Sequence, residues 1–523
     1  MKIPRLHDRN VYRPIVFTII WTMALFYIVS AAPLAAKQNQ AIKITENTGP
    51  ATTEMLVSRR ARVLEALDSG VMILFGAPQK VFSRDVNYPY RQESNFVYLT
   101  DVRQPGAALV LLPGNRSQRE ILFLPERDPA REVWTGKMLG VEEARRRTGI
   151  AQIWPVKEFD RFIKAVLQGS IYKARPSKDE EDYQAIREAI GRMTPVNVWL
   201  LADTDSKNRS RYPRALRFAS EALRFPAVQL RLATNIFRKL RGVKSSWEVE
   251  QLQRAIDITG QAQRNIMNHT ANTVGPLNES VLDGIILSTY RRNGARWGFP
   301  SIVASGPNAT TLHYEENSRE MVEGELILVD IGAAVGNYTA DITRTFPRNG
   351  VFTKAQRDVY KVVLEAQTQA IAAVRPGMTI RRVHNVARKT IVEGLWELGL
   401  ITSKSGNQYR MWFMHGTSHW LGLDVHDVGQ SDTPFKPGMV ITVEPGIYIR
   451  EDVLNNLDNT PQNRALIKAI QPAFLRYRNI GIRIEDDVLV TEEGSSVLSD
   501  RAPKTIEAIE AFMAKSILSL IHI

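Results

Sequence analysis

Residues 325–346, ELILVDIGAAVGNYTADITRTF, constrain the fold of this chain more than any other stretch. Two apolar runs flank a turn around Val335–Gly336, a pattern that predicts a β-hairpin. A turn centred on these two residues places Asp330 directly opposite Asp341 on the neighbouring strand. The hairpin therefore brings two carboxylates together on strands that are otherwise apolar.

Two carboxylates in that position are unfavourable without a counter-charge. Opposite side chains on paired strands are about 5 Å apart. At that distance two negative charges repel by about 3 kcal/mol at an effective dielectric constant near 20. Either one carboxylate is protonated or a cation lies between them. The alternative, that both point to water, is acceptable for one aspartate but less so for the pair.

Two further acidic residues accompany strand-like apolar runs. Glu444 follows Met439–Val443, and Glu485 lies within Ile482–Val490. Taken singly, each would be an ordinary residue facing solvent at a strand end. With the hairpin and one histidine they form a set of possible metal ligands, and four carboxylates can neutralise two divalent ions about 3.5–4 Å apart with a hydroxide between them. The acidic members of the set are Asp330, Asp341, Glu444 and Glu485.

The histidine comes from residues 415–427, HGTSHWLGLDVHD, which hold three of the eight histidines of the chain: His415, His419 and His426. A zinc-protease helix is excluded, because no glutamate follows His415 and glycines interrupt the run. The alternation from His419 to Val425 predicts a half-buried strand. A straight strand would place His419 and His426 on opposite faces. They share a site only if the chain bends, and Gly422 is where a bend costs least.

Composition excludes several functional classes. The chain has no cysteine, so disulfides, thiolate metal sites and a cysteine nucleophile are absent. The net charge of +13 raises the question of nucleic-acid binding. The basic residues are spread among acidic ones, and no basic helix, zinc finger or aromatic RNA-binding signature is present. We therefore expect a solvated basic surface and no nucleic-acid partner.

The first 36 residues have the layout of an export signal. A basic start is followed by the apolar run Ile15–Val29 and then by small residues at Ser30–Ala32 and Ala35–Ala36. Extended to Ala32, the run reaches the lower length limit of a membrane span. We expect an exported protein, periplasmic or extracellular. Residues 1–36 are either a cleaved signal peptide or an N-terminal anchor attached to the membrane through residues 15–32.

The rest of the chain divides into two domains. An α/β pattern predicts an N-terminal domain at residues 54–202. Residues 203–231, which are rich in arginine and carry two prolines, are the expected interdomain connection. A second domain is expected at 232–515, with capping boxes at Ser245 and Thr353 and a helix capped by Thr379. The strands predicted for the first domain are Val71–Phe75, Phe96–Leu99, Ala107–Leu112, Glu120–Leu124 and Val196–Leu201.

These residues carry a resemblance to the metallopeptidase family with the "pita-bread" catalytic fold, which includes aminopeptidase P, prolidase and methionine aminopeptidase. His415–Asp427 matches the proline-peptidase signature of that family. The resemblance implies five metal ligands, because their order in the family is matched by Asp330, Asp341, His419, Glu444 and Glu485. Tyr90–Thr100 (YRQESNFVYLT) and Leu312–Asn317 (LHYEEN) resemble segments typical of aminopeptidase P. The resemblance covers roughly residues 54–515. A long insertion between Glu451 and Asn479 departs from the family pattern and would border the site.

The resemblance implies a fold and a chemistry. The fold is α/β (α+β), a creatinase/prolidase-like N-terminal domain followed by a pita-bread catalytic domain. The activity is a metal-dependent Xaa-Pro aminopeptidase acting on peptides with proline in the second position. The cofactors are two divalent ions, manganese before cobalt or zinc, because the ligands are rich in oxygen. A homodimer or homotetramer is the expected assembly.

The resemblance also implies roles for individual residues. Glu444 would accept a proton, and His313 and His426 would contact the developing tetrahedral centre. Arg483 would share a strand face with Glu485 and hold a ligand or the substrate. His415 and Tyr448 are candidates for the wall of the substrate pocket.

Two other functions remain as alternatives. Prolidase, which cleaves only dipeptides, has the same metal ligands, so only the N-terminal domain and the pocket distinguish it. A non-catalytic peptide-binding protein of the same fold is the other alternative. It is less favoured, because all five ligands are present.

Overall fold

The computed structural model describes residues 49–67, 69–172, 175–202 and 212–521, which all belong to one compact unit, Asn47–Ile523. The export segment predicted at residues 1–36 lies outside the described residues. Across the part of the chain that is described, none of the helices combines the length and apolar character needed to cross a bilayer.

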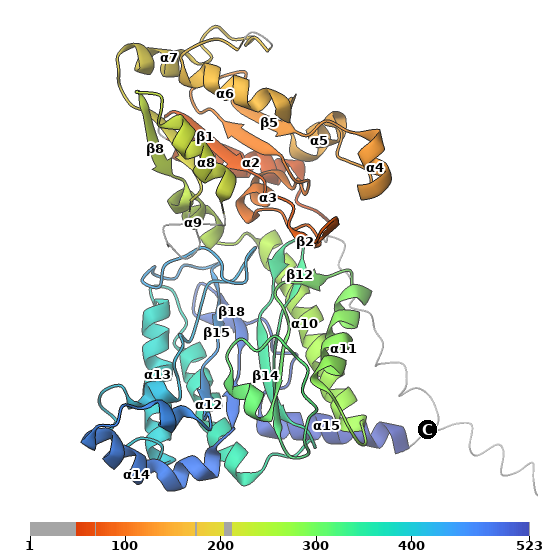
Figure 1. The fold of residues 1–523 in the computed structure, drawn as a ribbon, viewed down its shortest axis with the longest axis vertical. Coiled ribbons are helices and arrows are strands. Elements are labelled where there is room, and N and C mark those ends of the chain that lie inside the picture. Colours follow the sequence, from red (N-terminus) through yellow and green to blue (C-terminus); the bar gives the residue numbers. More distant parts are fainter. Residues whose placement is uncertain (1–48, 68, 173–174, 203–211, 522–523) are drawn as a thin grey trace, which may run out of the picture. The chain divides into compact units, whose positions relative to one another are not determined.

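The N-terminal domain is built on a six-stranded sheet of order β6-β5-β4-β1-β7-β8 (Figure 1). Strands β1, β7 and β8 run parallel, β4 is antiparallel to β1 and to β5, and β6 is parallel to β5. The strands are β1 (Val71–Phe75), β4 (Ala108–Leu111), β5 (Glu120–Leu124), β6 (Gln152–Pro155), β7 (Val196–Leu200) and β8 (Val228–Leu232), with a separate hairpin of β2 (Val81–Ser83) and β3 (Val86–Asn87). The helices are α2 (Thr53–Ala66), α3 (Ser94–Thr100), α4 (Pro129–Thr135), α5 (Val141–Thr148), α6 (Phe159–Leu167), α7 (Gln184–Gly191) and α8 (Pro213–Ala222), with a 3-10 turn η1 (Val156–Glu158).

Helices cover both faces of this sheet, which is why β1 is apolar throughout. All five residues of β1 are buried. Ile73 packs with Phe159 and Phe162, which lie on α6, whereas Met72 and Leu74 pack on the opposite face. Alternate side chains of a strand point to opposite faces, so a strand buried on both sides reads as a continuous apolar run.

Two sequence predictions for this domain are wrong. Residues 203–231 were predicted to connect the domains, but α8 and β8 occupy residues 213–232 and β8 extends the six-stranded sheet. The prolines that suggested a linker begin and follow helix α8, and Pro213 stands at its first position, where proline is tolerated. Phe96–Leu99 was predicted as a strand and is part of helix α3. The Glu93 side chain caps that helix by accepting from the Phe96 backbone N–H.

The C-terminal domain contains small antiparallel sheets with orders β10-β11-β14, β13-β12-β9, β15-β18-β19 and β16-β17. In Figure 1 the α10–α11 pair and the α12–α13 pair lie on either side of β14, β15 and β18. The strands are β9 (Arg296–Trp297), β10 (Ile302–Ser305), β11 (Leu326–Ile331), β12 (Ala333–Val335), β13 (Tyr338–Thr339), β14 (Ile342–Pro347), β15 (Val440–Val443), β16 (Gly446–Tyr448), β17 (Gly481–Arg483), β18 (Asp486–Val490) and β19 (Ser495–Val497). The helices are α9 (Thr234–Gly242), α10 (Ser246–Asn272), α11 (Glu279–Arg292), α12 (Lys354–Ala372), α13 (Ile380–Glu397), α14 (Pro461–Tyr477) and α15 (Ile506–Ile521), with 3-10 turns η3 (Gly306–Thr310), η4 (Gln408–Met411) and η5 (Val453–Asn456).

The helix starts predicted from capping residues are confirmed. Ser245 and Glu248 form a complete capping box at the start of α10, and Thr353 with Gln356 does the same for α12. The Thr379 side chain caps α13. Helix α10 is then fixed to the sheet by Gln263, whose amide donates to the carbonyl oxygens of Val329 and Ile342. These caps and side chains anchor the helices against the strands that carry the acidic residues.

The predicted hairpin forms with a register two residues away from the expected one. Its turn is Gly336–Asn337, both with positive φ (57° and 76°), as a two-residue type I′ turn requires. Val335 therefore pairs with Tyr338, and Asp330 pairs with Thr343 rather than Asp341. A shift of two residues preserves the alternation of side chains. In a regular ladder Asp341 would lie diagonally across from Asp330 on the same face.

The insertion at residues 451–479 consists of η5 and helix α14. Thr460 caps α14 by accepting from the Asn463 backbone N–H. At its C-terminal end the Phe474 ring packs near Trp412, and the Arg476 guanidinium pairs with Asp358 on α12. The insertion therefore packs on the helices beside the domain core, and the chain returns from it directly into β17.

Candidate metal centre

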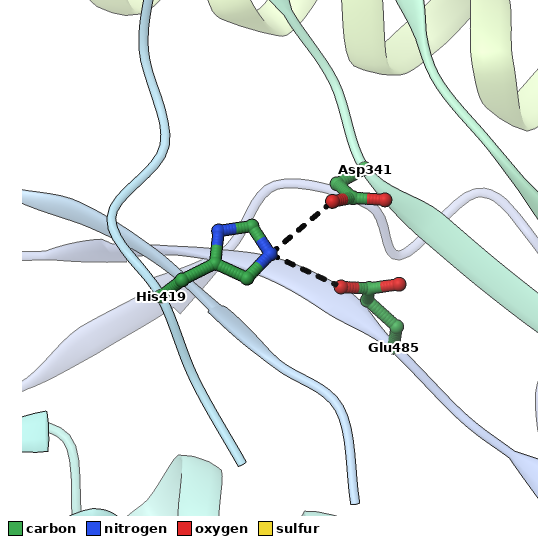
Figure 2. Close-up of side chains that lie close together, drawn as sticks. All are labelled: Asp341, His419 and Glu485. Carbon is green, nitrogen blue, oxygen red and sulfur yellow. Dashed lines mark ion pairs between the residues drawn. The ribbon is translucent and has the colours of Figure 1, made fainter. Parts of the chain in front are cut away.

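Five separate elements bring the predicted ligands together. Asp330 lies in β11, Asp341 directly precedes β14, and Glu444 directly follows β15. Glu485 occupies the break between β17 and β18, and His419 lies in the loop before β15. Figure 2 shows the His419 imidazole facing the carboxylates of Asp341 and Glu485. The ligand atoms of these three residues all lie within 4.8 Å of one another, a spacing that could hold a metal ion.

The tautomer of His419 makes this arrangement suitable for a cation. Its Nδ1 lies 3.1 Å from the carbonyl oxygen of Trp420. A carbonyl only accepts hydrogen bonds, so Nδ1 carries the proton and Nε2 presents a lone pair. This lone pair faces carboxylate oxygens at 3.3, 3.6 and 4.0 Å, from Asp341, Glu444 and Glu485 respectively. Metal-binding histidines commonly have their second nitrogen bonded to a carbonyl in this way.

Buried carboxylate oxygens also lack partners here. Oδ1 of Asp330 and Oδ1 of Asp341 are both buried without a hydrogen bond. A buried acceptor without a donor carries a substantial desolvation cost. Together with the lone pair of His419, these atoms form a set of donors that fits divalent cations.

The shifted pKa values of the ligands also indicate that the site lacks positive charge. Burial, followed by the charges of Glu485 and Asp330, raises the pKa of Asp341 well above its ordinary value. Burial raises the pKa of Glu444 to about 8, against the lowering effect of Arg483. Burial also lowers the pKa of His419 to about 4, which keeps the imidazole neutral as a ligand must be. A bound cation would reverse the carboxylate shifts by supplying the missing charge.

Arg483 connects the ligands to the predicted pocket wall. Its Nη2 donates to Oδ2 of Asp330 at 2.5 Å, and its Nη1 donates to the Tyr448 hydroxyl at 2.9 Å. The Tyr448 hydroxyl lies 2.9 Å from Nε2 of His415. Nδ1 of His415 is 2.7 Å from the Gly416 carbonyl oxygen and so carries the proton, which leaves Nε2 to accept from Tyr448. Sequence placed Arg483, Tyr448 and His415 near the site, and the structure joins them in one hydrogen-bonded chain.

His313 and His426 both have exposed side chains near the centre. The ring centroids of His419 and His426 are 4.4 Å apart. Burial lowers the pKa of His426, and His313 lowers it further, which places the two exposed histidines near each other. Their contact with a substrate stays a prediction.

The strand predicted from His419 to Val425 does not form. This segment has a single bridge, Trp420 to Ile441, and is otherwise irregular. The bend predicted at Gly422 is present, and it brings His419 and His426 to one site. A Cβ atom on Gly422 would lie only 2.1 Å from Oδ2 of Asp427, so the loop folds back too tightly for any side chain there.

Sequence reasoning missed the polar residues that hold the ligands. The Thr343 hydroxyl donates to Glu485 at 2.7 Å, and Asp487 accepts from the Asp341 backbone N–H at 3.1 Å. Asp487 is fully buried, and burial raises its pKa well above the ordinary value. The run of three acidic residues at 485–487 was visible in the sequence. Only Glu485 could be given a role, because the contact between Asp487 in β18 and Asp341 at the start of β14 is set by tertiary packing between two different sheets.

Comparison with known protein families gives two matches along the chain. Residues 56–172 match the N-terminal domain of aminopeptidase P, and residues 250–492 match metallopeptidase family M24. The second range contains all five predicted ligands.

Characterised proteins and solved structures agree with these matches. The chain is 34% identical to a Xaa-Pro aminopeptidase of Haemophilus influenzae over 88% of its length and 97% of that protein. It is 30% identical to human Xaa-Pro aminopeptidase 3 over 88% of its length and 84% of that protein. Its structure is similar to that of aminopeptidase P from E. coli with the inhibitor Pro-Leu, with a TM-score of 0.72 and 32% identity, over 90% of this chain and 99% of the other. The chain therefore belongs to metallopeptidase family M24 and, within it, to the metal-dependent aminopeptidases of the Xaa-Pro aminopeptidase group.

Proposed function

We propose that this chain hydrolyses the bond between an N-terminal residue and a following proline, with two divalent ions held by the five predicted ligands. The observation that carries the proposal is the neutral His419 imidazole, whose Nε2 lone pair faces three carboxylates within 4.0 Å. The relatives named Xaa-Pro aminopeptidase, which match almost the whole chain, support the choice of substrate.

The bond before proline is a tertiary amide without an N–H, so a peptidase that binds that donor is poorly matched to it. Bound divalent ions supply a water that loses its proton near neutral pH and a positive charge for the scissile carbonyl oxygen. Glu444, whose carboxylate lies 3.6 Å from His419, would accept the proton that such a water releases. The exposed imidazoles of His313 and His426 donate to the oxygen of the tetrahedral centre.

Arg483 holds Asp330 in place through the guanidinium bond described above. The same side chain orients Tyr448, which in turn fixes the ring of His415 on the wall of the pocket. A buried arginine that bonds a ligand restrains it in the way that outer hydrogen bonds generally orient metal ligands.

Manganese is the ion we propose for the active form. Four carboxylates and one imidazole form an oxygen-rich set that suits a hard, octahedral ion, whereas zinc sites usually recruit more nitrogen or sulfur. Cobalt and zinc are the alternatives, and metal analysis of the purified enzyme together with reconstitution of the metal-free protein distinguishes them.

The test of the activity is mass spectrometry on Xaa-Pro peptides of two to six residues, with and without a chelator. We expect release of the single N-terminal residue, and we expect the chelator to stop it. A protein that holds the peptides without cleaving them, with or without added metal, would instead be the non-catalytic alternative.

We also propose that the protein is exported, with attachment to the membrane through residues 15–32 if the segment is not removed. The basic start and apolar run of residues 1–36 support this. The homodimer or homotetramer expected for this chain stays a prediction, which light scattering coupled to size-exclusion chromatography measures.

A further inference from the structure

We infer that the N-terminal domain positions His426 for catalysis, and that the anchors it uses are separate from those that position the metal ligand His419. The junction that does this consists of Arg91, Ser94, Arg241, Lys244, Asp424 and Asp427. The inference rests on the proposed function for the role of His426, whereas the junction itself is defined by contacts alone.

The first half of the loop is attached to strand β15 of the catalytic domain. The His419 backbone N–H donates to the Thr442 hydroxyl at 3.1 Å, and the Thr442 N–H donates back to the His419 carbonyl at 3.0 Å. The Leu421 N–H donates to Val440 at 3.1 Å. His419 therefore takes its position from the same strand that leads into Glu444.

The next part of the loop is attached to the N-terminal domain through Asp424. Its carboxylate accepts from the Ser94 hydroxyl at 2.8 Å and from Nη2 of Arg91 at 3.3 Å. Arg91 also donates to the Leu423 carbonyl at 2.7 Å. Arg91 and Ser94 lie in the YRQESNFVYLT segment, so these bonds are the direct contact between that segment and the loop.

Arg241, at the end of α9, joins Asp424 to Asp427. Its guanidinium donates to Asp424 at 3.0 Å, pairs closely with Asp427, and donates to Asn95 at 2.7 Å. Lys244 pairs with the other oxygen of Asp427 at 3.3 Å. The side chains of Arg241, Lys244 and Asp427 are each at most 2% exposed, so these charges depend on one another for compensation.

His426 lies between Asp424 and Asp427, and its own imidazole is exposed toward the site. Its position is therefore set by the backbone on either side of it. The Asp427 N–H donates to the Trp420 carbonyl at 2.9 Å, which closes the loop between residues 420 and 427. The Thr339 N–H donates to the Gly422 carbonyl at 2.9 Å, which attaches the loop to strand β13. Between these bonds the Gly422 N–H donates to the Asp424 carbonyl at 3.2 Å, and the side chains of the two aspartates add the contacts described above. Arg91, Ser94 and Arg241 thus act as positioning residues rather than catalytic ones.

Loosening the junction should reduce turnover without releasing metal. We expect Arg91→Ala to lower kcat about 10-fold and Asp424→Ala about 100-fold, the scale of losses that misplacement of a catalytic group by about 1 Å produces. KM should change little, because His426 acts on the transition state. Asp424→Asn keeps an acceptor for Ser94 and should recover part of the loss. Metal content should stay equal to that of the wild type in all three variants.

Arg103→Ala is the matched control. Arg103 is exposed to the same degree as Arg91 (43% and 41% of the side chain) and also reaches from the N-terminal to the catalytic domain. Its hydrogen bonds go to Asn337 and Gly336 at the hairpin turn and to Asp101 rather than to Leu423 or Asp424. Arg103→Ala should therefore leave kcat within about twofold of the wild type, because it leaves the hydrogen bonds of Leu423 and Asp424 in place and surface substitutions away from such contacts have small effects.

Hydrogen–deuterium exchange measures how firmly the junction holds the loop, without relying on enzyme activity. Amides of residues 422–427 should exchange faster in Arg91→Ala and Asp424→Ala, while those of residues 417–421 stay unchanged, and neither range should change in Arg103→Ala. Loss of metal in step with kcat, equal exchange gains in both halves of the loop, or equal effects of Arg91→Ala and Arg103→Ala would each overturn the inference. A wild-type protein that does not cleave Xaa-Pro peptides would refute the proposed function. The exchange data would still show whether the junction restrains residues 422–427.

Discussion

Nε2 of His419 lies 3.3 Å from Oδ2 of Asp341, although helices α12 and α13 separate the two residues in the chain. Because Nδ1 of His419 is bonded to a carbonyl, this short approach joins two atoms that both present lone pairs. Such an approach is favourable when a cation lies between them. The first prediction follows from this pair.

Asp341→Asn should abolish metal binding and activity while the fold is retained. The substitution removes a charged ligand but preserves the shape of the side chain, and an uncharged group suits the buried position, where burial already raises the pKa of Asp341. Since loss of even an outer-shell partner costs about 10- to 100-fold in metal affinity or activity, a direct ligand should cost at least about 100-fold. Elemental analysis, circular dichroism and peptide hydrolysis measure the three effects.

Thermal unfolding supplies the control for that variant. Ligands that bind only the folded state stabilise it by about 2.7 kcal/mol at a concentration of 100 Kd. Manganese should raise the Tm of the metal-free wild type and leave that of Asp341→Asn unchanged. A fully active Asp341→Asn enzyme, or an active wild type with almost no bound metal, would contradict the assignment of this site.

The substrate prediction concerns peptide length. The enzyme should cleave Xaa-Pro-Xaa faster than Xaa-Pro at equal concentration, because the YRQESNFVYLT segment belongs to a separate domain that can wall one side of the site and leave room beyond the proline. A dipeptidase needs a cation that captures the carboxylate directly after proline. Arg483 is already committed to Asp330 and Tyr448. Rapid turnover of the dipeptide with almost none of the tripeptide would identify a prolidase.

Gly422→Ala should inactivate the enzyme through the geometry of the loop. The new Cβ would lie 2.1 Å from Oδ2 of Asp427 and 3.2 Å from Cε of Lys244, so the buried ion pair must move. We expect kcat to fall about 100-fold, as for displacement of a reacting group by about 1 Å. Gly284→Ala, in helix α11 where nothing lies within 4 Å of the added atom, should keep full activity and gain up to about 1 kcal/mol in stability.

Glu93→Gln should change how stability depends on pH. Burial raises the pKa of Glu93 above its ordinary value of 4.5, against hydrogen bonds from Phe96 and Asn95 and the charge of Arg241. A carboxyl with a raised pKa in the folded state contributes stability below its ordinary pKa and loses it as the pH rises. Relative to Glu93→Gln, the wild type should therefore become less stable as the pH increases above about 4.5. Urea unfolding of both proteins from pH 4 to pH 8 measures the difference, and a wild type that gains stability relative to Glu93→Gln as the pH rises would contradict the expected sign.

Export is tested by fractionation of cells that express the full-length chain. We expect the enzyme outside the cytoplasm, and N-terminal sequencing then shows whether residues 1–36 have been removed. Deletion of residues 2–36 is the control and should leave active enzyme in the cytoplasm. Full-length enzyme that is soluble in the cytoplasm would refute export.

Several features of this protein follow from the sequence alone because they depend on local patterns. The capping boxes at Ser245 and Thr353 placed two helix starts correctly, since a cap is formed by residues only three positions apart. The apolar runs of β1 and β11 were placed correctly for a similar reason, because a strand buried on both faces reads as a continuous apolar run, which in β11 only Asp330 interrupts. The candidate ligands could be named because acidic residues in apolar strands are costly without a counter-charge.

Other features depend on contacts between distant segments, which local patterns do not contain. The hairpin register moved by two residues because the backbone of Gly336–Asn337 set the turn. Residues 203–231 were predicted to be a linker, but the described part of this range forms helix α8 and most of strand β8, because pairing with β7 outweighs a weak local signal. The loop around His426 is held by the buried Arg241 on α9 and by Arg91 and Ser94 of the N-terminal domain. Sequence determined which side chains could bind metal, and tertiary packing decided how they are held, because each is oriented by partners from elements far away in the chain.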